Sequence, residues 1–150
     1  MRARDLMLPV TTLRPEDSAA ELLRAFEDPV VRAAAVVSAE GRLLGLISEE
    51  DMLASCLPSY VLEDQALAKV LEEDVGSRLR ERLEGKRVQQ VVNTERRQTP
   101  PVSPEANLVE VATSLARSGD PAVLVAERGR VLGVITVDVL LPALLGPPSA

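Results

Sequence analysis

The chain has 150 residues, of which 46% are hydrophobic and 27% charged, and these proportions are typical of a soluble globular protein rather than a disordered or fibrous one. Its formal net charge is −6, and its only aromatic residues are Phe26 and Tyr60. Such a chain is not expected to bind nucleic acid directly, because phosphate neutralisation by basic residues and base stacking on aromatic ones supply most of that affinity.

The beginning of the chain, MRARDLMLPV, has no apolar run of signal-peptide length, and no stretch approaches the roughly 20 apolar residues that a membrane helix needs. We therefore expect a cytoplasmic protein with no membrane partner. The single cysteine, Cys56, cannot form an internal disulfide. Because the chain has no histidine to activate a thiol, Cys56 is predicted to be a small buried hydrophobe rather than a reactive group.

The usual groups of an enzyme active site are missing from the sequence. There is no histidine, no cluster of metal-ligating residues and no glycine-rich phosphate loop. Since these groups most often supply a general base or an activated nucleophile, the chain is predicted not to be an enzyme. We expect neither a metal site nor an obligatory cofactor.

The first part of the chain is predicted to form a strand, a helix, two further strands and a second helix. Ser18 precedes Glu21 by three residues, which is the spacing of a capping box at a helix start. Two apolar runs on either side of SAEGR then indicate a β-hairpin, and a helix is expected over 49–57. The first helix is indicated by apolar residues at the i, i+3, i+4 and i+7 positions, namely Ala19, Leu22, Leu23 and Phe26.

A helical insert is predicted over 58–87, where apolar residues form a helical stripe among many charges. Gly76 is expected to break this helical segment, and Gly85 to end it. Two interpretations stay open: the insert covers the core of its own molecule, or it makes a dimer contact. The stripe consists of Leu62, Ala66, Leu67, Val70, Leu71, Val75, Leu79 and Leu83.

The rest of the chain repeats the first part. PAVLVAERGRVLGVITVDVLL at 121–141 matches AAAVVSAEGRLLGLISEEDML at 33–53, with Gly133 on Gly45, an offset of 88. VSPEANLVEVATSL at 102–115 matches LRPEDSAAELLRAF at 13–26, and a last helix is expected over 137–145. So small a unit can hardly bury its own faces. We therefore expect an α+β fold in which the two copies pack sheet against sheet about a pseudo-twofold axis.

The heptapeptide at the end of each hairpin points to a family. GLISEED, from Gly45 to Asp51, GVITVDV, from Gly133 to Val139, and the opening segment RDLMLPVTTLRPEDS together resemble the CBS family. The resemblance implies a tandem pair, or Bateman module, with a first motif at 1–57, the insert at 58–87 and a second motif at 88–150. It also implies a sensor of an adenine nucleotide (AMP, ADP or ATP) that forms a homodimer and signals to an effector protein on another chain.

Site residues follow from the resemblance. In the family the Ser or Thr of the heptapeptide binds phosphate and the Asp binds the ribose, which implies these roles for Ser48 and Asp51. A hydroxyl beside a helix N-terminus suits phosphate, and a carboxylate can accept from two ribose hydroxyls. The base is then expected beside the other copy, near Thr99, Pro100 and the segment from Asp120 to Ala122.

The second cleft is expected to be the weaker site. It would use Thr136, faced by the segments 10–12 and 32–34, which include Thr12 and Arg32. Val139 stands where the ribose-binding carboxylate belongs, and Asp138 lies one position early, about 100° around the helix.

Each of these features also has a purely structural interpretation. Ser48 and Asp51 form the pattern of an ordinary capping box, and Thr136 that of a plain helix cap. Arg96 and Arg97 are either phosphate contacts or solvated charges. The alternative for the whole chain is a ligand-free CBS module that serves in dimerisation or scaffolding.

Overall fold

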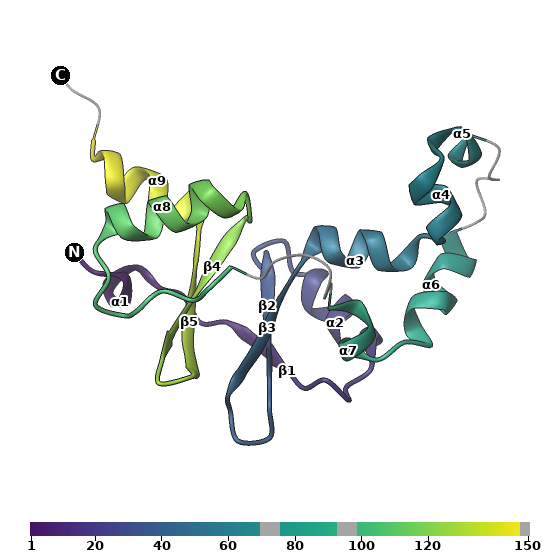
Figure 1. Ribbon diagram of the computed structural model, residues 1–150, viewed down its shortest axis with the longest axis horizontal. Helices are drawn as coiled ribbons and strands as arrows, with labels where there is room; N and C mark the ends of the chain where they lie inside the picture. Colours follow the sequence, from purple (N-terminus) through teal and green to yellow (C-terminus); the bar gives the residue numbers. More distant parts are fainter. Residues whose placement is uncertain (70–75, 93–98, 148–150) are drawn as a thin grey trace.

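The computed structural model describes residues 1–69, 76–92 and 99–147, and it confirms an α+β fold built from two similar halves (Figure 1). In each half a β-hairpin points away from the helices that cover the sheet. The elements are α1 (Ala3–Leu6), β1 (Thr11–Leu13), α2 (Ala19–Phe26), β2 (Ala33–Val37), β3 (Leu43–Ser48), α3 (Glu49–Cys56), α4 (Ser59–Glu63), α5 (Gln65–Ala68), α6 (Gly76–Glu84), α7 (Val88–Val91), α8 (Leu108–Ser118), β4 (Ala122–Glu127), β5 (Arg130–Thr136) and α9 (Val137–Leu145).

The first half has the predicted order of elements. The Ser18 side chain accepts a hydrogen bond from the Ala20 N–H, so α2 begins where the capping pattern places it. Strand β2 is the centre of the sheet, parallel to β1 and antiparallel to β3. Its first residue, Ala33, lies opposite Ser48, the last residue of β3. Ser48, the residue predicted to bind phosphate, thus lies at the end of the sheet opposite the hairpin turn.

The second half departs from the prediction at its first strand. Strands β4 and β5 pair as expected, but Val102 forms only an isolated parallel bridge with Val125. The sequence around it is rich in proline, at positions 100, 101 and 104. Proline has no N–H to donate to a strand ladder, so the pairing does not extend beyond Val102.

The two sheets pack face to face, as the repeat predicted. At the hairpin turns Arg42 forms an antiparallel bridge with Arg130, and the Leu43 N–H donates to the Gly129 carbonyl at 2.7 Å. Because the paired residues are equivalents in the repeat, the contact lies on the pseudo-twofold axis. The buried residues between the sheets are Ala33, Ala35, Leu46, Ala122, Leu124 and Val134.

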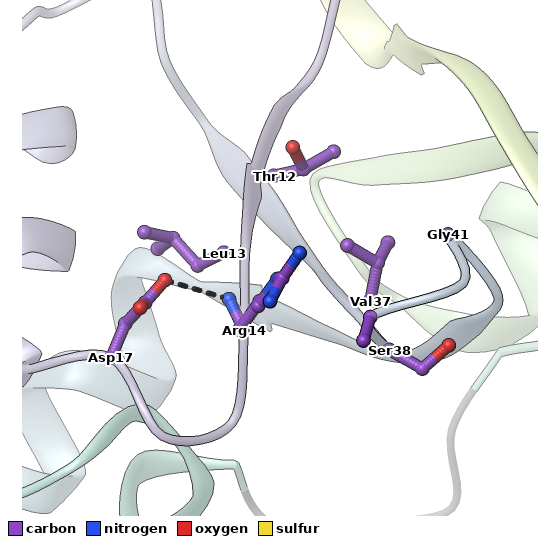
Figure 2. Close-up of a pocket in the computed structure, with 8 residues that line it drawn as sticks. Thr12, Leu13, Arg14, Asp17, Val37, Ser38 and Gly41 are labelled. Atoms are coloured by element: carbon purple, nitrogen blue, oxygen red, sulfur yellow. Dashed lines mark hydrogen bonds between the residues drawn. The ribbon is translucent and has the colours of Figure 1, made fainter.

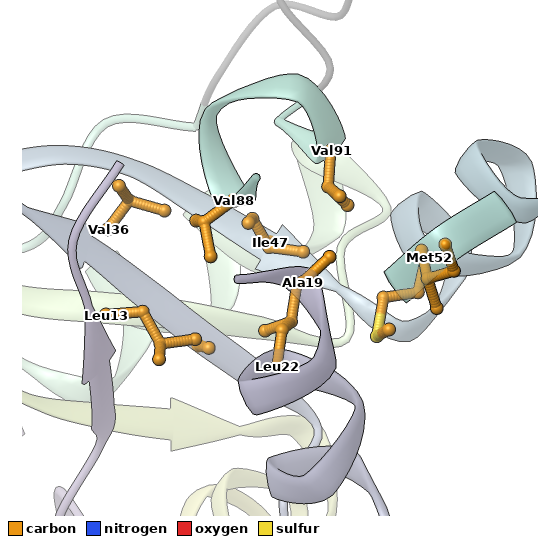
Figure 3. Close-up of a cluster of buried hydrophobic side chains, with 10 residues drawn as sticks. Leu13, Ala19, Leu22, Val36, Ile47, Met52, Val88 and Val91 are labelled. Atoms are coloured by element: carbon orange, nitrogen blue, oxygen red, sulfur yellow. The ribbon is translucent and has the colours of Figure 1, made fainter. Parts of the chain in front are cut away.

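The first helices of the two motifs, α1 and α7, are exchanged between the two halves. Ala3, in α1, is buried in the core of the second half, and its N–H donates to the Ala106 carbonyl at 2.9 Å. Val88 and Val91, in α7, are buried in the core of the first half, beside Leu22 of α2 (Figure 3). Each half therefore depends on a segment from the opposite half to complete its core.

Within the described residues, the insert is helical and lies beside the first half only (Figure 1). Leu83 of α6 is buried in the first core, which supports the covering interpretation for this helix. Helices α4 and α5 expose Tyr60, Leu62 and Leu67. The predicted stripe residues Val70, Leu71 and Val75 lie outside the described residues.

Cys56 differs from its prediction. It is half-buried at the end of α3, packs against the first core, and its thiol donates to the Leu53 carbonyl at 3.2 Å. The sequence placed it in a helix but could not show that it stands at the edge of the apolar face.

Candidate functional site

Ser48 and Asp51 meet at the N-terminus of α3. The Asp51 Oδ2 accepts from the Ser48 N–H at 2.9 Å and from the Ser48 hydroxyl at 3.2 Å, and the Asp51 N–H lies 3.3 Å from Ser48 Oγ. Only 2% of Ser48 and 6% of Asp51 is exposed. The two residues form the predicted capping box, so their helix-capping role is present in the structure itself. A ligand at this cleft would share a carboxylate that already holds the helix start.

A second buried carboxylate belongs to the segment predicted to face the base. Asp120, which precedes β4, is 7% exposed and accepts a hydrogen bond from the Thr99 hydroxyl. The structure thus brings together two of the residues predicted for the base, Thr99 and Asp120.

The N-terminus of α9 is arranged differently. Thr136 is 6% exposed but makes no cap hydrogen bond to the α9 backbone. Its hydroxyl instead donates to the Asp138 carboxylate, and this bond is the main reason that the pKa of Asp138 lies below its ordinary value. Backbone N–H groups and the positive charge of Arg32 lower this pKa further, while partial burial opposes them. Arg32 of the first half therefore acts on a carboxylate at the start of α9.

The two helix starts carry opposite electrostatic environments. Arg32 and Asp120 are equivalents at the 88-residue offset, and so are Glu50 and Asp138. The positions equivalent to Arg32 and Asp138 therefore both carry carboxylates, Asp120 and Glu50. At the start of α9 a cation, Arg32, thus acts on the carboxylate of Asp138, whereas the equivalent positions at the start of α3 are both acidic.

The remaining predicted residues are spread over other environments. Ala122 is fully buried between the sheets, so only its backbone could face a ligand. Pro100 is exposed, and Thr12 lines a hollow at the hairpin end of the first sheet (Figure 2). Arg96 and Arg97 lie outside the described residues.

Sequence reasoning missed the link between Thr136 and Asp138. It considered Asp138 only as a displaced ribose ligand. The signal was the spacing itself, because a carboxylate two residues after a helix-start hydroxyl lies within its reach.

Two absences concern only the described residues. No group of three or more Cys, Asp or Glu side chains is arranged to hold a metal ion. In the same part of the chain, none of the helices has the length and apolar character to cross a membrane.

Comparison with known proteins agrees with this architecture. The family model for the CBS domain matches residues 3–57 and 88–146. The chain belongs to the CBS-domain family and carries two copies of the domain in tandem. No match was found among curated proteins.

Solved structures share the fold over nearly the whole chain. A CBS domain-containing protein of unknown function from Kribbella flavida is 23% identical, with a TM-score of 0.79 over 97% of this chain and 99% of its own. The CBS domain of a membrane protein from Sphaerobacter thermophilus is 25% identical, with a TM-score of 0.70 over 94% of this chain and 86% of its own. CBSX2 in complex with AMP is 21% identical, with a TM-score of 0.67 over 96% of both chains.

Proposed function

We propose that this CBS pair is a regulatory module that binds an adenine nucleotide in the clefts at the starts of α3 and α9 and signals its presence to a partner protein. We propose the α3 cleft, with Ser48 and Asp51, as the better site. We also propose that the first motif spans 1–57, the insert 58–87 and the second motif 88–150. The fold shared with CBSX2, whose structure holds AMP, supports the ligand class.

The observation that carries the proposal is the buried pair of Ser48 and Asp51. A hydroxyl and a carboxylate meet at a helix N-terminus, where the helix dipole favours a phosphate and the carboxylate can accept from ribose hydroxyls. In the α9 cleft Val139 replaces the carboxylate, and the Thr136 hydroxyl is engaged by Asp138. Nucleotide binding there should be weaker.

Charge suggests which nucleotide the α3 cleft prefers. Three acidic residues, Glu49, Glu50 and Asp51, lie in the first turn of α3. Each added phosphate brings negative charge toward these carboxylates, and like charges repel more strongly where solvent screening is weak. We therefore propose that AMP binds more tightly than ADP, and ADP more tightly than ATP.

Calorimetric titration of AMP, ADP and ATP tests the proposal. Asp51→Asn keeps an oxygen that can accept from the Ser48 N–H but removes the charge, so it should weaken AMP binding at least about tenfold without unfolding α3. Asp64→Asn is the matched control, because Asp64 caps α5 in the insert. AMP binding that is equal in wild type and Asp51→Asn would refute the assignment of this cleft.

We also propose a homodimer that uses the exposed side of α9. Val137, Leu141, Leu144 and Leu145 of this helix are between 37% and 71% exposed. An apolar helix face of this kind is unfavourable in water and suits a second copy of the chain. Light scattering after gel filtration should give the dimer mass, and Leu141→Glu with Leu145→Glu should give the monomer mass.

A further inference from the structure

A hollow of about 490 Å³ lies at the end of the first sheet that is opposite Ser48 (Figure 2). We call it the hairpin-end hollow; it lies between the end of β1 and the turn that joins β2 to β3. Its size is within the range of small-molecule sites. Its lining residues are Thr12, Leu13, Arg14, Asp17, Val37, Ser38, Ala39 and Gly41.

Arginines from both halves lie near this hollow, Arg14 in its lining and Arg130 against the lining residue Gly41. Figure 2 shows the Arg14 side chain between the end of β1 and the turn. Arg130, from the start of β5, lies across the turn: its Nη1 is 3.4 Å from the position that a Cβ on Gly41 would occupy. Gly41 has a φ of +83°, so this position already disfavours a side chain. The glycine leaves room for the guanidinium at the rim of the hollow.

The same region holds a repulsive pair. Arg42 and Arg130 are directly bridged across the pseudo-twofold axis, and like charges at such positions destabilise a sheet. Each lies against the glycine of the opposite turn, since Arg42 Nε is 3.4 Å from the position of a Cβ on Gly129.

Among the described residues, the neighbouring acidic groups form no ion pair with these arginines, although Glu127 is the residue opposite Arg130 in the β4–β5 pairing. The ion pairs among the described residues are Arg4 with Glu105 and Arg80 with Glu84, and both lie elsewhere. Asp17 accepts from the Arg14 backbone N–H at 2.8 Å, not from its guanidinium. The other charged residues of the two turns are Glu40, Glu127 and Arg128, and none forms an ion pair within the described part of the chain.

We propose that the hairpin-end hollow binds a phosphate-bearing small molecule between Arg14 and Arg130, separately from the helix-start clefts. Guanidinium groups bind phosphate through paired hydrogen bonds, and the hydroxyls of Thr12 and Ser38 add polar groups to the lining. An anion would also relieve the repulsion between Arg42 and Arg130. The site exists on one side of the pseudo-twofold axis only, because the residue of the second copy that corresponds to Arg14 is Ser103.

Pyrophosphate is the probe, titrated at constant ionic strength against a chloride reference so that general screening is subtracted. Wild-type protein should bind it, and Arg14→Gln and Arg130→Gln should each weaken the binding at least about tenfold. Arg24→Gln, an exposed arginine of α2, is the matched control and should leave it unchanged. Equal unfolding temperatures would show that the variants are folded.

The position of the bound anion is read from backbone amide shifts in NMR spectra. The amides of Ser38 and Gly41 should shift on adding pyrophosphate, with those of Glu49 and Glu50 unmoved. Absence of binding, an equal loss in Arg24→Gln, or shifts confined to the start of α3 would each overturn the proposal. Since none of these readouts requires an adenine nucleotide, failure here is distinguishable from failure of the regulatory function.

Discussion

The Lys86 Nζ donates to the backbone carbonyl of Ser55 at 2.7 Å and lies 3.2 Å from the Ser55 hydroxyl, so the segment after the insert is attached to the last turn of α3. No basic residue of α3 itself stands in that turn. A cation there satisfies a carbonyl and interacts favourably with the negative end of the helix dipole. Helix α3 is thus held at its start by Asp51 and at its end by Lys86.

The pKa of Lys86 is lowered from its ordinary value of 10.5, first by burial and then by the charge of Arg82. The unfolded chain therefore keeps a proton that the folded protein loses between the lowered pKa and 10.5, and stability should rise with pH through that window. Urea unfolding from about pH 8 to about pH 10.5 should show this rise in wild type relative to Lys86→Met. Parallel curves for the two proteins would contradict the prediction.

Removing the Ser48 hydroxyl should cost more stability than removing that of Thr136. Ser48 caps α3 in a buried box, whereas Thr136 makes no cap bond to α9. Ser48→Ala is expected to lower the free energy of unfolding by about 1 kcal/mol or somewhat more, as for other helix caps. Hydrogen exchange should accelerate at the first turn of α3. A larger loss of unfolding free energy in Thr136→Ala than in Ser48→Ala would contradict this prediction.

The Thr136 hydroxyl should control the titration of Asp138. Because this hydrogen bond is the largest cause of the lowered pKa, Thr136→Val should raise the pKa of Asp138 toward 3.8, and Arg32→Gln should raise it less. An NMR titration of the carboxylate measures both values. The stability that the interaction supplies is present above pH 3.8 and is lost as the pH falls through the folded pKa, so Thr136→Val should flatten the acid limb of the stability curve.

Gly133 is required by a close approach of the N-terminal segment. A Cβ at this position would stand 2.8 Å from the Leu8 carbonyl oxygen, which accepts from the Val134 N–H at 2.9 Å. Gly133→Ala should therefore displace the segment and cost about 1–3 kcal/mol. Gly76→Ala is the control, because a Cβ there meets nothing within 4 Å. Its stability should be unchanged or slightly higher, since alanine favours a helix.

Local features of the fold could be predicted from the sequence because they depend on neighbouring residues. The capping pairs and apolar spacing placed α2 over Ala19–Phe26, and the final apolar run placed α9 over Val137–Leu145. No regular strand forms at Val102 because the prolines around it interrupt strand pairing, an effect that the repeat alone does not predict. The exchange of α1 and α7 depends on packing between residues roughly 70 to 100 positions apart, which no short pattern reveals.

For the site, too, contacts between neighbouring residues could be predicted from the sequence, and contacts between the two halves could not. The contact between Ser48 and Asp51 follows from a spacing of three residues at a helix start. The effect of Arg32 on Asp138 arises only when the halves are assembled. The position of Arg130 against Gly41 was missed because the two residues are far apart in the chain.

The exchange of α1 and α7 also sets an order of events during synthesis. Among the described residues, the last contributions to the core of the first half come from α7 and the adjoining Val92, so this core can form before the second half is made. The core of the second half needs Ala3, made at the outset, and β5, made near the end. We expect the first motif to fold while the chain is still growing. Helix α1 should pack into its place only after β5 has been translated.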